Sequence, residues 1–532
     1  MTKKIFIGGA WPYANNSLHL DHIAALFPGD IIARYYRKTG ASVLYVSGTD
    51  CHGTPITLRA KDNGVSPEQI ALEYHQEFKE CFEQLNLSYD SYTLTHNKFH
   101  DSFVKDVIKK LFDSGEFYEK NEPQAYCEHC QQFLSDREIE GKCPICGGHA
   151  KGDQCDDCLA TFDADLLLNK SCKYCGSAVS KKDNIHLYWK LSKYQKAIHD
   201  YVTSHKEDWR FSSINESLKY LFNGGLIDRA VTRQLTWGIN VLIRGFEDKK
   251  IYVWIEAVLG YLSAGIKYCQ EHNLNWQDFY KNSSNLDTYY VHGKDNIPFH
   301  TIIFPALLLA LDDDLALPNH IVSSQFLNID DEKISKSKGN GITVKDLLKS
   351  YTADSIRYCL TCQAPETKDT NFSYEVLEQL HNKSLVGEYG NFVNRNLAFL
   401  VKNFDGHIPN GNIDLNVISK IKGTYTNVGN LIEKSELRAA VQEIQQLVRF
   451  ANKYYDDRQP WIQVKQDISA FNDTTATCLA LIVNIANLYE PFIPNSSQKV
   501  YEFFGISKPK WEYISIDSRR TLKDISVIFN RI

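Results

Sequence analysis

The sequence lacks the long apolar stretches and the strong basic charge that mark two large classes of protein. No run of 18 apolar residues occurs among its 532 residues, so we expect no membrane span. The N-terminal stretch MTKKIFIGGAWPY has only a short apolar segment and no cleavage site, so we do not expect a signal peptide. The net charge is −6, so any nucleic acid must be held by local patches and shape rather than by a general basic field.

Methionine is nearly absent, since Met1 is the only one, and internal repeats and low-complexity segments are missing. Methionine is a replaceable filler of cores, so we attribute its scarcity to compositional drift. The chain is 43% hydrophobic and 12% aromatic, which excludes a disordered chain and allows large cores. Its length predicts about three to five structural units.

Strand-like and helix-like segments alternate from residue 1 to about 115. We expect strands at 4–8 and 42–47, and helices at 67–85 and at 22–38, where Pro28 marks a kink or a restart. This alternation is typical of βαβ units, and it predicts a parallel sheet with helices on its faces.

The alternation stops at about residue 116 and resumes later in the chain. Strand-like runs return at 251–254, 286–292 and 316–323, with an apolar helix at 300–311. We therefore expect one sheet domain that is split by an insertion. Helical periodicity then dominates and predicts a helix bundle built from residues 374–404, 416–435, 437–457 and 475–504.

Cysteines are concentrated in the insertion. Of the 14 in the chain, eight form four CxxC pairs, namely Cys127 with Cys130, Cys143 with Cys146, Cys155 with Cys158, and Cys172 with Cys175. In a reducing cytosol such clusters bind metal rather than form disulfides, and one CxxC turn supplies two thiolates to tetrahedral zinc. The pairs predict two closed, structural zinc sites, with a redox role as the alternative. Spacing alone leaves open whether pairs adjacent in sequence share a metal or whether the pairs are nested.

Two short segments indicate phosphate binding. His19 and His22 lie at the start of a helix, where backbone N–H groups and the helix dipole favour phosphate. The stretch NIDDEKISKSKGNGI, residues 328–342, places Lys333 and Lys336 among serines and glycines. Such a loop suits a triphosphate and the charge that develops when pyrophosphate leaves, although a basic loop alone is weak evidence.

Together these segments resemble a known family. HLDH at residues 19–22 and KISKS at residues 333–337 are similar to the two signatures of class I aminoacyl-tRNA synthetases. The surrounding stretches GAWPYANNSLHL, VSGTDCHGTPI, YVWIEAVLGY, HGKDNIPFH and GNFVNRNLAFL closely resemble the methionyl-tRNA synthetase family, as do the four cysteine pairs. The resemblance covers essentially the whole chain.

The resemblance implies an α/β fold. A Rossmann-type parallel-sheet catalytic domain carries an inserted zinc-knuckle module and is followed by an all-α anticodon-binding helix bundle. The implied division is catalytic domain, first half, 1–115; connective insertion, 116–235; catalytic domain, second half, 236–325; KISKS loop and stem-contact region, 326–385; and anticodon-binding domain, 386–532.

The resemblance also implies an activity. The carboxylate of L-methionine attacks the α-phosphate of ATP, and methionyl-adenylate then transfers its methionyl group to the terminal adenosine of tRNA(Met). We expect Mg²⁺ with the ATP and up to two structural Zn²⁺ ions. We expect a cytoplasmic monomer, because the extra C-terminal dimerisation domain of some family members is absent from this sequence.

Roles for individual residues follow from the same resemblance. The catalytic set is His19, His22, Lys333 and Lys336. The ATP-binding set adds Asp21, Gly293, Asp295, Ser335 and Ser337. The methionine-binding set is Trp11, Tyr13, Asp50, Trp254, Ala257, Tyr261 and His300, with Asp50 holding the α-ammonium group. The anticodon-reading set is Asn391, Arg395 and Trp461, which can bond to base edges or stack on a base. The resemblance favours nested cysteine pairs, with Cys127, Cys130, Cys172 and Cys175 around the other four.

Asp21 departs from the family, which usually has glycine there so that the backbone can approach the adenine closely. An acid adds bulk and negative charge near ATP, unless its side chain turns to solvent or caps the helix. This leaves an alternative function, a paralogue with impaired adenylation that binds tRNA or methionine. A class I ligase for valine, isoleucine or leucine would need a large editing insertion, and a cysteine enzyme would place zinc at its substrate with dispersed ligands.

Overall fold

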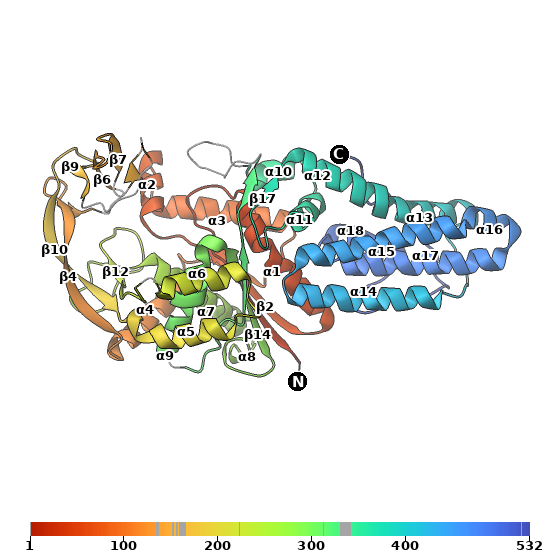
Figure 1. Cartoon of the computed structure of the whole chain (residues 1–532), viewed down its shortest axis with the longest axis horizontal. Coiled ribbons are helices and arrows are strands. Elements are labelled where there is room, and N and C mark those ends of the chain that lie inside the picture. The colour runs from red at the N-terminus through yellow and green to blue at the C-terminus, as the bar shows by residue number, and fades with distance from the viewer. Residues whose placement is uncertain are drawn as a thin grey trace.

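The computed structural model describes residues 2–532 except 135–137, 152–153, 156–157, 159–165, 223, 312, 330–341 and 523. A parallel five-stranded sheet with the order β15-β14-β1-β2-β3 lies in the N-terminal half of the molecule (Figure 1). Its strands are β1 (Lys4–Gly9), β2 (Ser42–Thr49), β3 (Ser91–Leu94), β14 (Leu286–Gly293) and β15 (His320–Ser324). Because segments from both sides of the insertion contribute strands, the predicted split sheet is confirmed.

Helices cover both faces of this sheet. Successive residues of β1 point to opposite faces, so Ile5 and Ile7 belong to one buried cluster and Phe6 to another. The first cluster includes residues of α1 (Leu20–Thr39) and α3 (Pro67–Gln84). The second includes residues of α4 (Lys98–Asp113), α7 (Val253–Glu271) and α9 (Phe304–Leu311). Pro28 lies inside α1 and does not end it.

Two predicted elements differ from the structure. The strand expected at 251–254 is wrong, because β13 is only Lys250–Ile251 and Val253 already begins α7. A short apolar run cannot be assigned by periodicity alone. The single helix expected at 475–504 is two helices, α17 (Ile468–Tyr489) and α18 (Pro494–Phe504). Pro494 starts α18, where proline is favoured at the first helical position.

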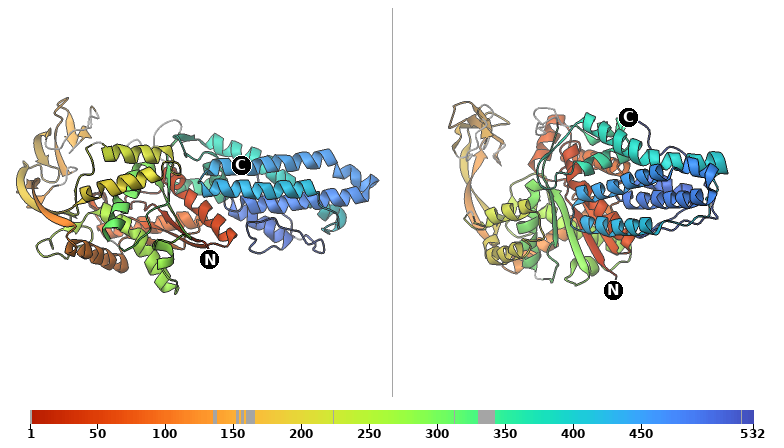
Figure 2. Two further views of the ribbon diagram at one scale, coloured as in Figure 1. Left: turned by 60° about the horizontal axis from the view of Figure 1, so that its bottom comes forward. Right: turned by 45° about the vertical axis from the view of Figure 1, so that its right-hand side comes forward.

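The insertion leaves the sheet domain on a long antiparallel ribbon of β4 (Phe117–Cys127) and β10 (Ser180–Trp189). At its tip lies a small sheet with the order β8-β7-β6-β9. These strands are β6 (Ile139–Lys142), β7 (His149–Lys151), β8 (Gln154–Cys155) and β9 (Leu168–Cys172). Figures 1 and 2 show this tip at one end of the molecule and the helices of the C-terminal half at the other.

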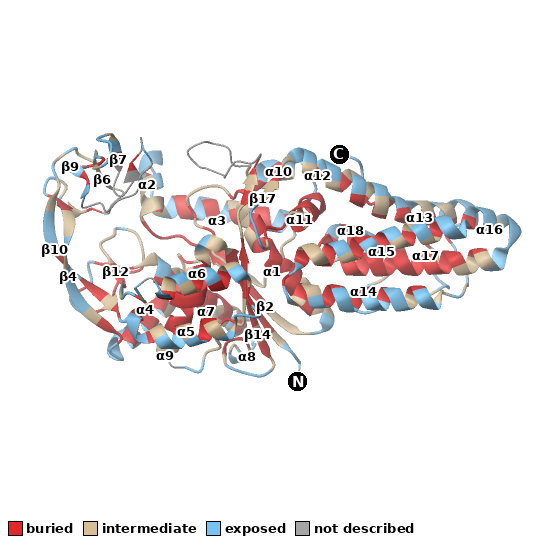
Figure 3. Cartoon of the chain, viewed as in Figure 1, coloured by how far each residue is buried: buried red, intermediate tan, exposed pale blue. Residues whose placement is uncertain are grey.

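The predicted helix bundle is present in the C-terminal half. Its main helices are α13 (Asn391–Phe404), α14 (Leu415–Glu433), α15 (Leu437–Arg458), α16 (Pro460–Gln466), α17 and α18. Among the described residues only α17 is long and apolar enough to cross a membrane, yet 72% of its most apolar window is buried within the protein. Figure 3 shows α17 buried along most of its length, so its apolar composition is explained by its place in the bundle core.

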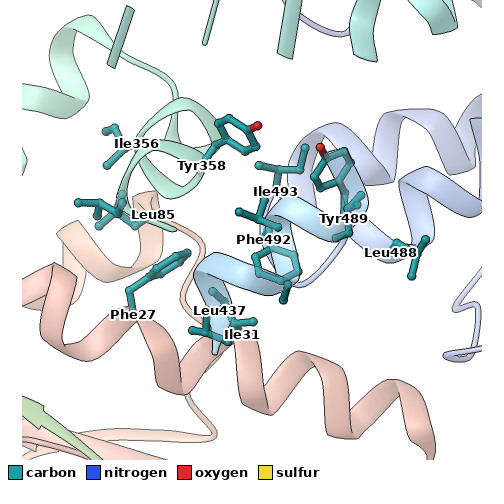
Figure 4. Packing of buried hydrophobic residues seen from close by; sticks show 14 of the residues in the cluster. Phe27, Ile31, Leu85, Ile356, Tyr358, Leu437, Leu488, Tyr489, Phe492 and Ile493 are labelled. Atoms are coloured by element: carbon teal, nitrogen blue, oxygen red, sulfur yellow. The ribbon is translucent and has the colours of Figure 1, made fainter. Parts of the chain in front are cut away.

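The bundle packs directly against the sheet domain. Phe27 and Ile31 of α1 belong to the same buried cluster as Phe492 and Ile493, which follow α17 (Figure 4). The helix that begins at the first signature therefore runs from the sheet edge to the base of the bundle.

Candidate active site

A cleft of about 610 Å³ opens beside the carboxyl ends of the sheet strands. Its lining includes Trp11 and Tyr13 after β1, Asp50 after β2, Asp295 after β14 and Phe326 after β15. Ligands of open α/β sheets bind at this edge, outside the carboxyl ends of the strands. The cleft is therefore the candidate active site.

One wall of the cleft is the N-terminus of α1. His19 is the N-cap residue, and its backbone N–H donates to Nδ1 of His22 across 3.1 Å. Because Nδ1 of His22 accepts this bond, the ring proton of neutral His22 resides on Nε2. His22 lines the cleft, whereas the side chain of His19 is almost fully buried. This wall combines an imidazole with the N-terminus of a helix, whose dipole suits a phosphate.

Asp21 lies on the same wall. Its Oδ1 is 3.4 Å from Nδ1 of His22, and its side chain is 33% exposed and lines the cleft. The capping interactions of α1 are made by His19 and His22, so Asp21 does not cap the helix. Its carboxylate adds negative charge to the wall that suits a phosphate.

The described residues that flank the second signature also meet this wall. Lys333, Ser335, Lys336 and Ser337 lie outside the described residues. On the N-terminal side of that segment Gln325 and Phe326 line the cleft. On the other side, the N–H of Leu20 donates to the carbonyl of Ile342 across 3.1 Å, and the N–H of Val344 donates to that of Leu18 across 2.9 Å. The chain around the second signature is thus hydrogen-bonded to the first.

Some of the residues predicted for methionine line the same cleft. Asp50 is almost fully buried, and burial together with the nearby Glu256 raises the pKa of its carboxyl group well above the ordinary value. An ammonium group in the cleft would offset this cost and keep Asp50 ionised. Trp254, on α7, lines the cleft with its ring stacked on Phe299 at 4.4 Å.

Tyr261 and His300 form a neutral, hydrogen-bonded pair behind the cleft. Nδ1–H of His300 donates to the carbonyl of Asn296 across 2.9 Å, so Nε2 accepts from the Tyr261 hydroxyl across 2.8 Å. Burial lowers the pKa of His300 to about 4, so the ring is neutral at pH 7. Neither side chain lines the cleft; Trp11, which does, lies edge-on to Tyr261 at 6.4 Å. Ala257, one turn before Tyr261 on α7, is half-buried.

The remaining predicted ATP-binding residues, Gly293 and Asp295, also line the cleft. A Cβ at Gly293 would come within 2.6 Å of an Asp295 carboxylate oxygen, so a larger residue there would require the Asp295 side chain to shift. The sequence did not point to Arg233, which lines the cleft from β12 (Thr232–Arg233) with its guanidinium 4.2 Å from the centre of the Tyr252 ring. A lone arginine in an irregular segment carries no sequence signal, and only the fold brings it to the site.

The eight paired cysteines form two clusters. Cys127, Cys130, Cys172 and Cys175 make one, and Cys143, Cys146, Cys155 and Cys158 make the other, with all sulfurs of a cluster within 4.8 Å of one another. The nested pairing is therefore confirmed and the sequential pairing is excluded. Neighbouring sulfurs include Cys127 and Cys175 at 3.5 Å and Cys130 and Cys172 at 3.9 Å. A Zn–S bond of 2.3 Å in a tetrahedron predicts about 3.8 Å, so both clusters fit zinc.

The residues predicted to read the anticodon lie at the far end of the bundle. Asn391 and Arg395 are one turn apart on α13, and Trp461 is the second residue of α16, with 42% of its surface exposed. The Arg395 guanidinium lies 4.0 Å from the centre of the Tyr455 ring, and the centres of the Tyr455 and Trp461 rings are 5.5 Å apart. Arg395 also donates to Asp456 across 2.8 Å. Tyr455 thus joins the predicted arginine and tryptophan.

Comparisons with known proteins agree with this architecture. The family described as tRNA synthetases class I (M) matches residues 5–397, and the anticodon binding domain of methionyl tRNA ligase matches residues 407–527. The chain is 48% identical over 531 residues to a methionine–tRNA ligase of Bacillus cereus (strain B4264), covering 99% of this chain and 96% of that protein. It is 45% identical over 528 residues to methionine–tRNA ligase 1 of Alkaliphilus oremlandii (strain OhILAs), covering 99% and 97%. Mycobacterium tuberculosis methionyl-tRNA synthetase in complex with methionyl-adenylate has a similar fold, with a TM-score of 0.81 at 24% identity over 100% of both chains.

Proposed function

This chain belongs to the methionyl-tRNA synthetase family of class I aminoacyl-tRNA synthetases, and from that premise we propose how its cleft performs the methionine–tRNA ligase reaction. The observation that carries the proposal is that one cleft combines two unlike environments. The buried carboxyl group of Asp50 and the N-terminus of α1 both line it. An amino acid and a nucleotide phosphate need these two environments side by side.

Methionine occupies the Asp50 end. Its ammonium group pairs with Asp50, and its carboxylate faces the guanidinium of Arg233. The thioether lies against Trp254 and, once Trp11 moves aside, against Ala257, Tyr261 and His300. A neutral and largely aromatic pocket suits a polarizable sulfur without charge. Tyr13 supports this end, because its hydroxyl donates to the carbonyl of His52 across 2.6 Å.

ATP occupies the other end, with its phosphates at His19 and His22 and its nucleoside beside Gly293 and Asp295. Lys333 and Lys336, with Ser335 and Ser337, stabilise the negative charge that grows on the phosphates as pyrophosphate leaves. Mg²⁺ bound with ATP would neutralise part of the same charge. Most of the rate acceleration then comes from positioning and from charge stabilisation rather than from covalent chemistry by the protein.

We infer that Asp21 weakens ATP binding and does not abolish adenylation. The carboxylate lines the cleft, so it repels the phosphates, but water still reaches a third of its side chain and screens that repulsion. The second candidate function, a tRNA- or methionine-binding paralogue with impaired adenylation, is favoured by this one residue only. We propose further that the cysteine clusters hold two structural zinc ions, that Asn391, Arg395 and Trp461 contact the anticodon of tRNA(Met), and that the enzyme acts as a cytoplasmic monomer.

Transfer of labelled amino acid to tRNA tests the proposal. We expect charging of tRNA(Met) with methionine, and no charging with valine, isoleucine, leucine or cysteine. Charging should fall by at least 100-fold in Asp50→Asn, because the ammonium group then loses the buried carboxylate that pairs with it. Tight methionine binding without any charging would instead support the paralogue.

A further inference from the structure

A chain of hydrogen-bonded side chains runs from the methionine end of the cleft to the surface. Nδ1 of His52 lies 2.5 Å from Oε1 of Glu256, and its Nε2 lies 3.2 Å from Nδ1 of His96. Nε2 of His96 lies 3.3 Å from Oε1 of Glu68. Glu256 is fully buried and the His52 side chain is 5% exposed, whereas the Glu68 side chain is 56% exposed. The reaction steps proposed above use none of these four groups.

The contact between His52 and Glu256 is the shortest link of this chain. An ionised carboxylate can only accept hydrogen bonds, so Nδ1–H of His52 donates to Glu256. Although burial opposes ionisation, His52 and His100 keep the pKa of Glu256 below the ordinary value of 4.5, which agrees with an ionised Glu256.

His52 also belongs to the loop that presents Asp50. Its backbone N–H lies 3.4 Å from Oδ1 of Asp50, and its carbonyl accepts the Tyr13 hydroxyl. The indole N–H of Trp237 donates to the carbonyl of Cys51 across 2.6 Å, and Gly53, the residue after His52, has a φ of 109°. The loop is therefore held by hydrogen bonds of its backbone and by the bond from the His52 ring to Glu256.

Glu256 comes from a different part of the fold. It lies in the first turn of α7, between Trp254 and Ala257, which are predicted to bind the methionine side chain. The contact between Glu256 and His52 therefore joins the loop for the ammonium group to the helix for the thioether. It fixes the position of the ammonium loop relative to that helix.

We propose that Glu256 is a positioning residue for methionine, which through the ring of His52 holds the Asp50 loop at a fixed place against α7. The proposal rests on the role given to Asp50 under the proposed function. Glu256 does not touch the substrate, so its loss affects methionine binding far more than ATP binding. The effect depends on the negative charge and not only on the volume of the side chain, because an ionised carboxylate accepts the hydrogen bond of the buried His52 ring more strongly than a neutral amide does.

The test is steady-state ATP–pyrophosphate exchange with methionine and ATP varied separately. Glu256→Gln keeps the volume and removes the charge, and we expect the KM for methionine to rise by at least about 10-fold while the KM for ATP stays within about twofold. Glu256→Asp, which keeps the charge, should recover part of the loss. Glu73→Gln, a neutralised exposed carboxylate on α3, is the matched control and should equal the natural protein.

Three outcomes overturn the proposal: an unchanged KM for methionine in Glu256→Gln, an equal rise in both KM values, or no recovery in Glu256→Asp. If Glu256→Gln does not fold, the KM values for methionine and ATP are measured in His52→Gln instead, and the same changes in these values support or overturn the proposal. Asp50→Asn distinguishes a failure of the Asp50 assignment from a failure of the Glu256 proposal. If it leaves the KM for methionine unchanged, the assigned role of Asp50 fails; if it raises that KM and Glu256→Gln does not, only the present inference fails.

Discussion

Asp30 of α1 and Arg357 of α11 (Ala353–Cys362) form a fully buried ion pair with 2.7 Å between Oδ2 and the guanidinium nitrogen Nη2. Arg34 contacts the same carboxylate at 2.9 Å and extends the contact to Glu490 at the end of α17. Arg357 also donates to the carbonyls of Pro491 and Phe492. The helix that begins at the first signature is thus tied to the base of the bundle by charge as well as by apolar packing.

Removing the negative charge of Asp30 should destabilise the protein. Asp30→Asn leaves two buried arginines short of a partner, and we expect the free energy of unfolding to fall by about 3–5 kcal/mol. Chemical denaturation at pH 7 measures it. Asp200→Asn removes an exposed carboxylate that pairs with Lys196, and its denaturation midpoint should not change. Equal midpoints for the two variants would show that the buried pair does not stabilise the junction.

The same carboxylate predicts a pH dependence. Burial opposes ionisation of Asp30, but Arg34 and Arg357 outweigh it and hold its pKa well below the ordinary value of 3.8. A lowered pKa stabilises the fold at every pH above 3.8, and the contribution is lost only as the pH falls through the lower value of the folded state. The stability difference between the natural protein and Asp30→Asn should therefore be constant from pH 7 to pH 5. A difference that shrinks within that range contradicts the assignment.

Asp21 should weaken ATP binding through its charge. At a separation of about 4 Å in water, two unit charges interact by about 1 kcal/mol, which corresponds to roughly a fivefold change in affinity. We expect Asp21→Gly to lower the KM for ATP by about that factor and to leave the KM for methionine unchanged. Asp21→Asn, which retains the bulk, distinguishes charge from size, because it should give most of the same gain. A gain only in the glycine variant would assign the effect to bulk.

The cysteine clusters predict two independent zinc ions. Cys127→Ser combined with Cys175→Ser should bind one zinc instead of two, because the cluster of Cys143, Cys146, Cys155 and Cys158 shares none of its ligands. Metal content per chain, measured by mass spectrometry of the intact protein, gives the count. Cys362→Ser, outside both clusters, should keep two. Loss of both metals from the double variant would show that the sites are not independent.

Substitutions at the far end of the bundle should affect only the transfer of methionine to tRNA, not the formation of methionyl-adenylate. Trp461→Ala removes an exposed ring that can stack on an unpaired base, and we expect the KM for tRNA(Met) to rise by about 10-fold or more. ATP–pyrophosphate exchange, which needs no tRNA, should stay unchanged. Leu415→Ala is a control, since Leu415 is an exposed bundle residue at the start of α14. Equal effects in both variants would indicate general damage to the bundle.

Sequence patterns predicted the elements whose signal is local. The strands at Lys4–Gly9 and Ser42–Thr49, and the helix at Pro67–Gln84 with its Ser66 cap, follow directly from apolar periodicity and capping residues. The start of α7 was missed because Val253 and Trp254 favour a strand locally, and only burial of the helix against β2 and α4 decides.

Long-range contacts set the rest of the candidate site. Asp50 was named from its surroundings in the sequence, but the buried Glu256 that raises its pKa follows more than two hundred residues later, and no local pattern joins the two carboxyl groups. Arg233 reaches the cleft from a two-residue strand, and Trp11 separates the cleft from Tyr261. These relationships depend on packing between separate elements, so they became visible only in the fold.

Methionine-dependent exchange of labelled pyrophosphate into ATP tests the central claim most directly. The natural protein should catalyse exchange with methionine alone among the amino acids, even with Asp21 in its cleft. Lys336→Ala should reduce the rate by about 100-fold or more at unchanged fold, since it removes a charge that acts mainly in the transition state. No exchange by the natural protein, with exchange restored in Asp21→Gly, would contradict the account and make the chain a binding paralogue.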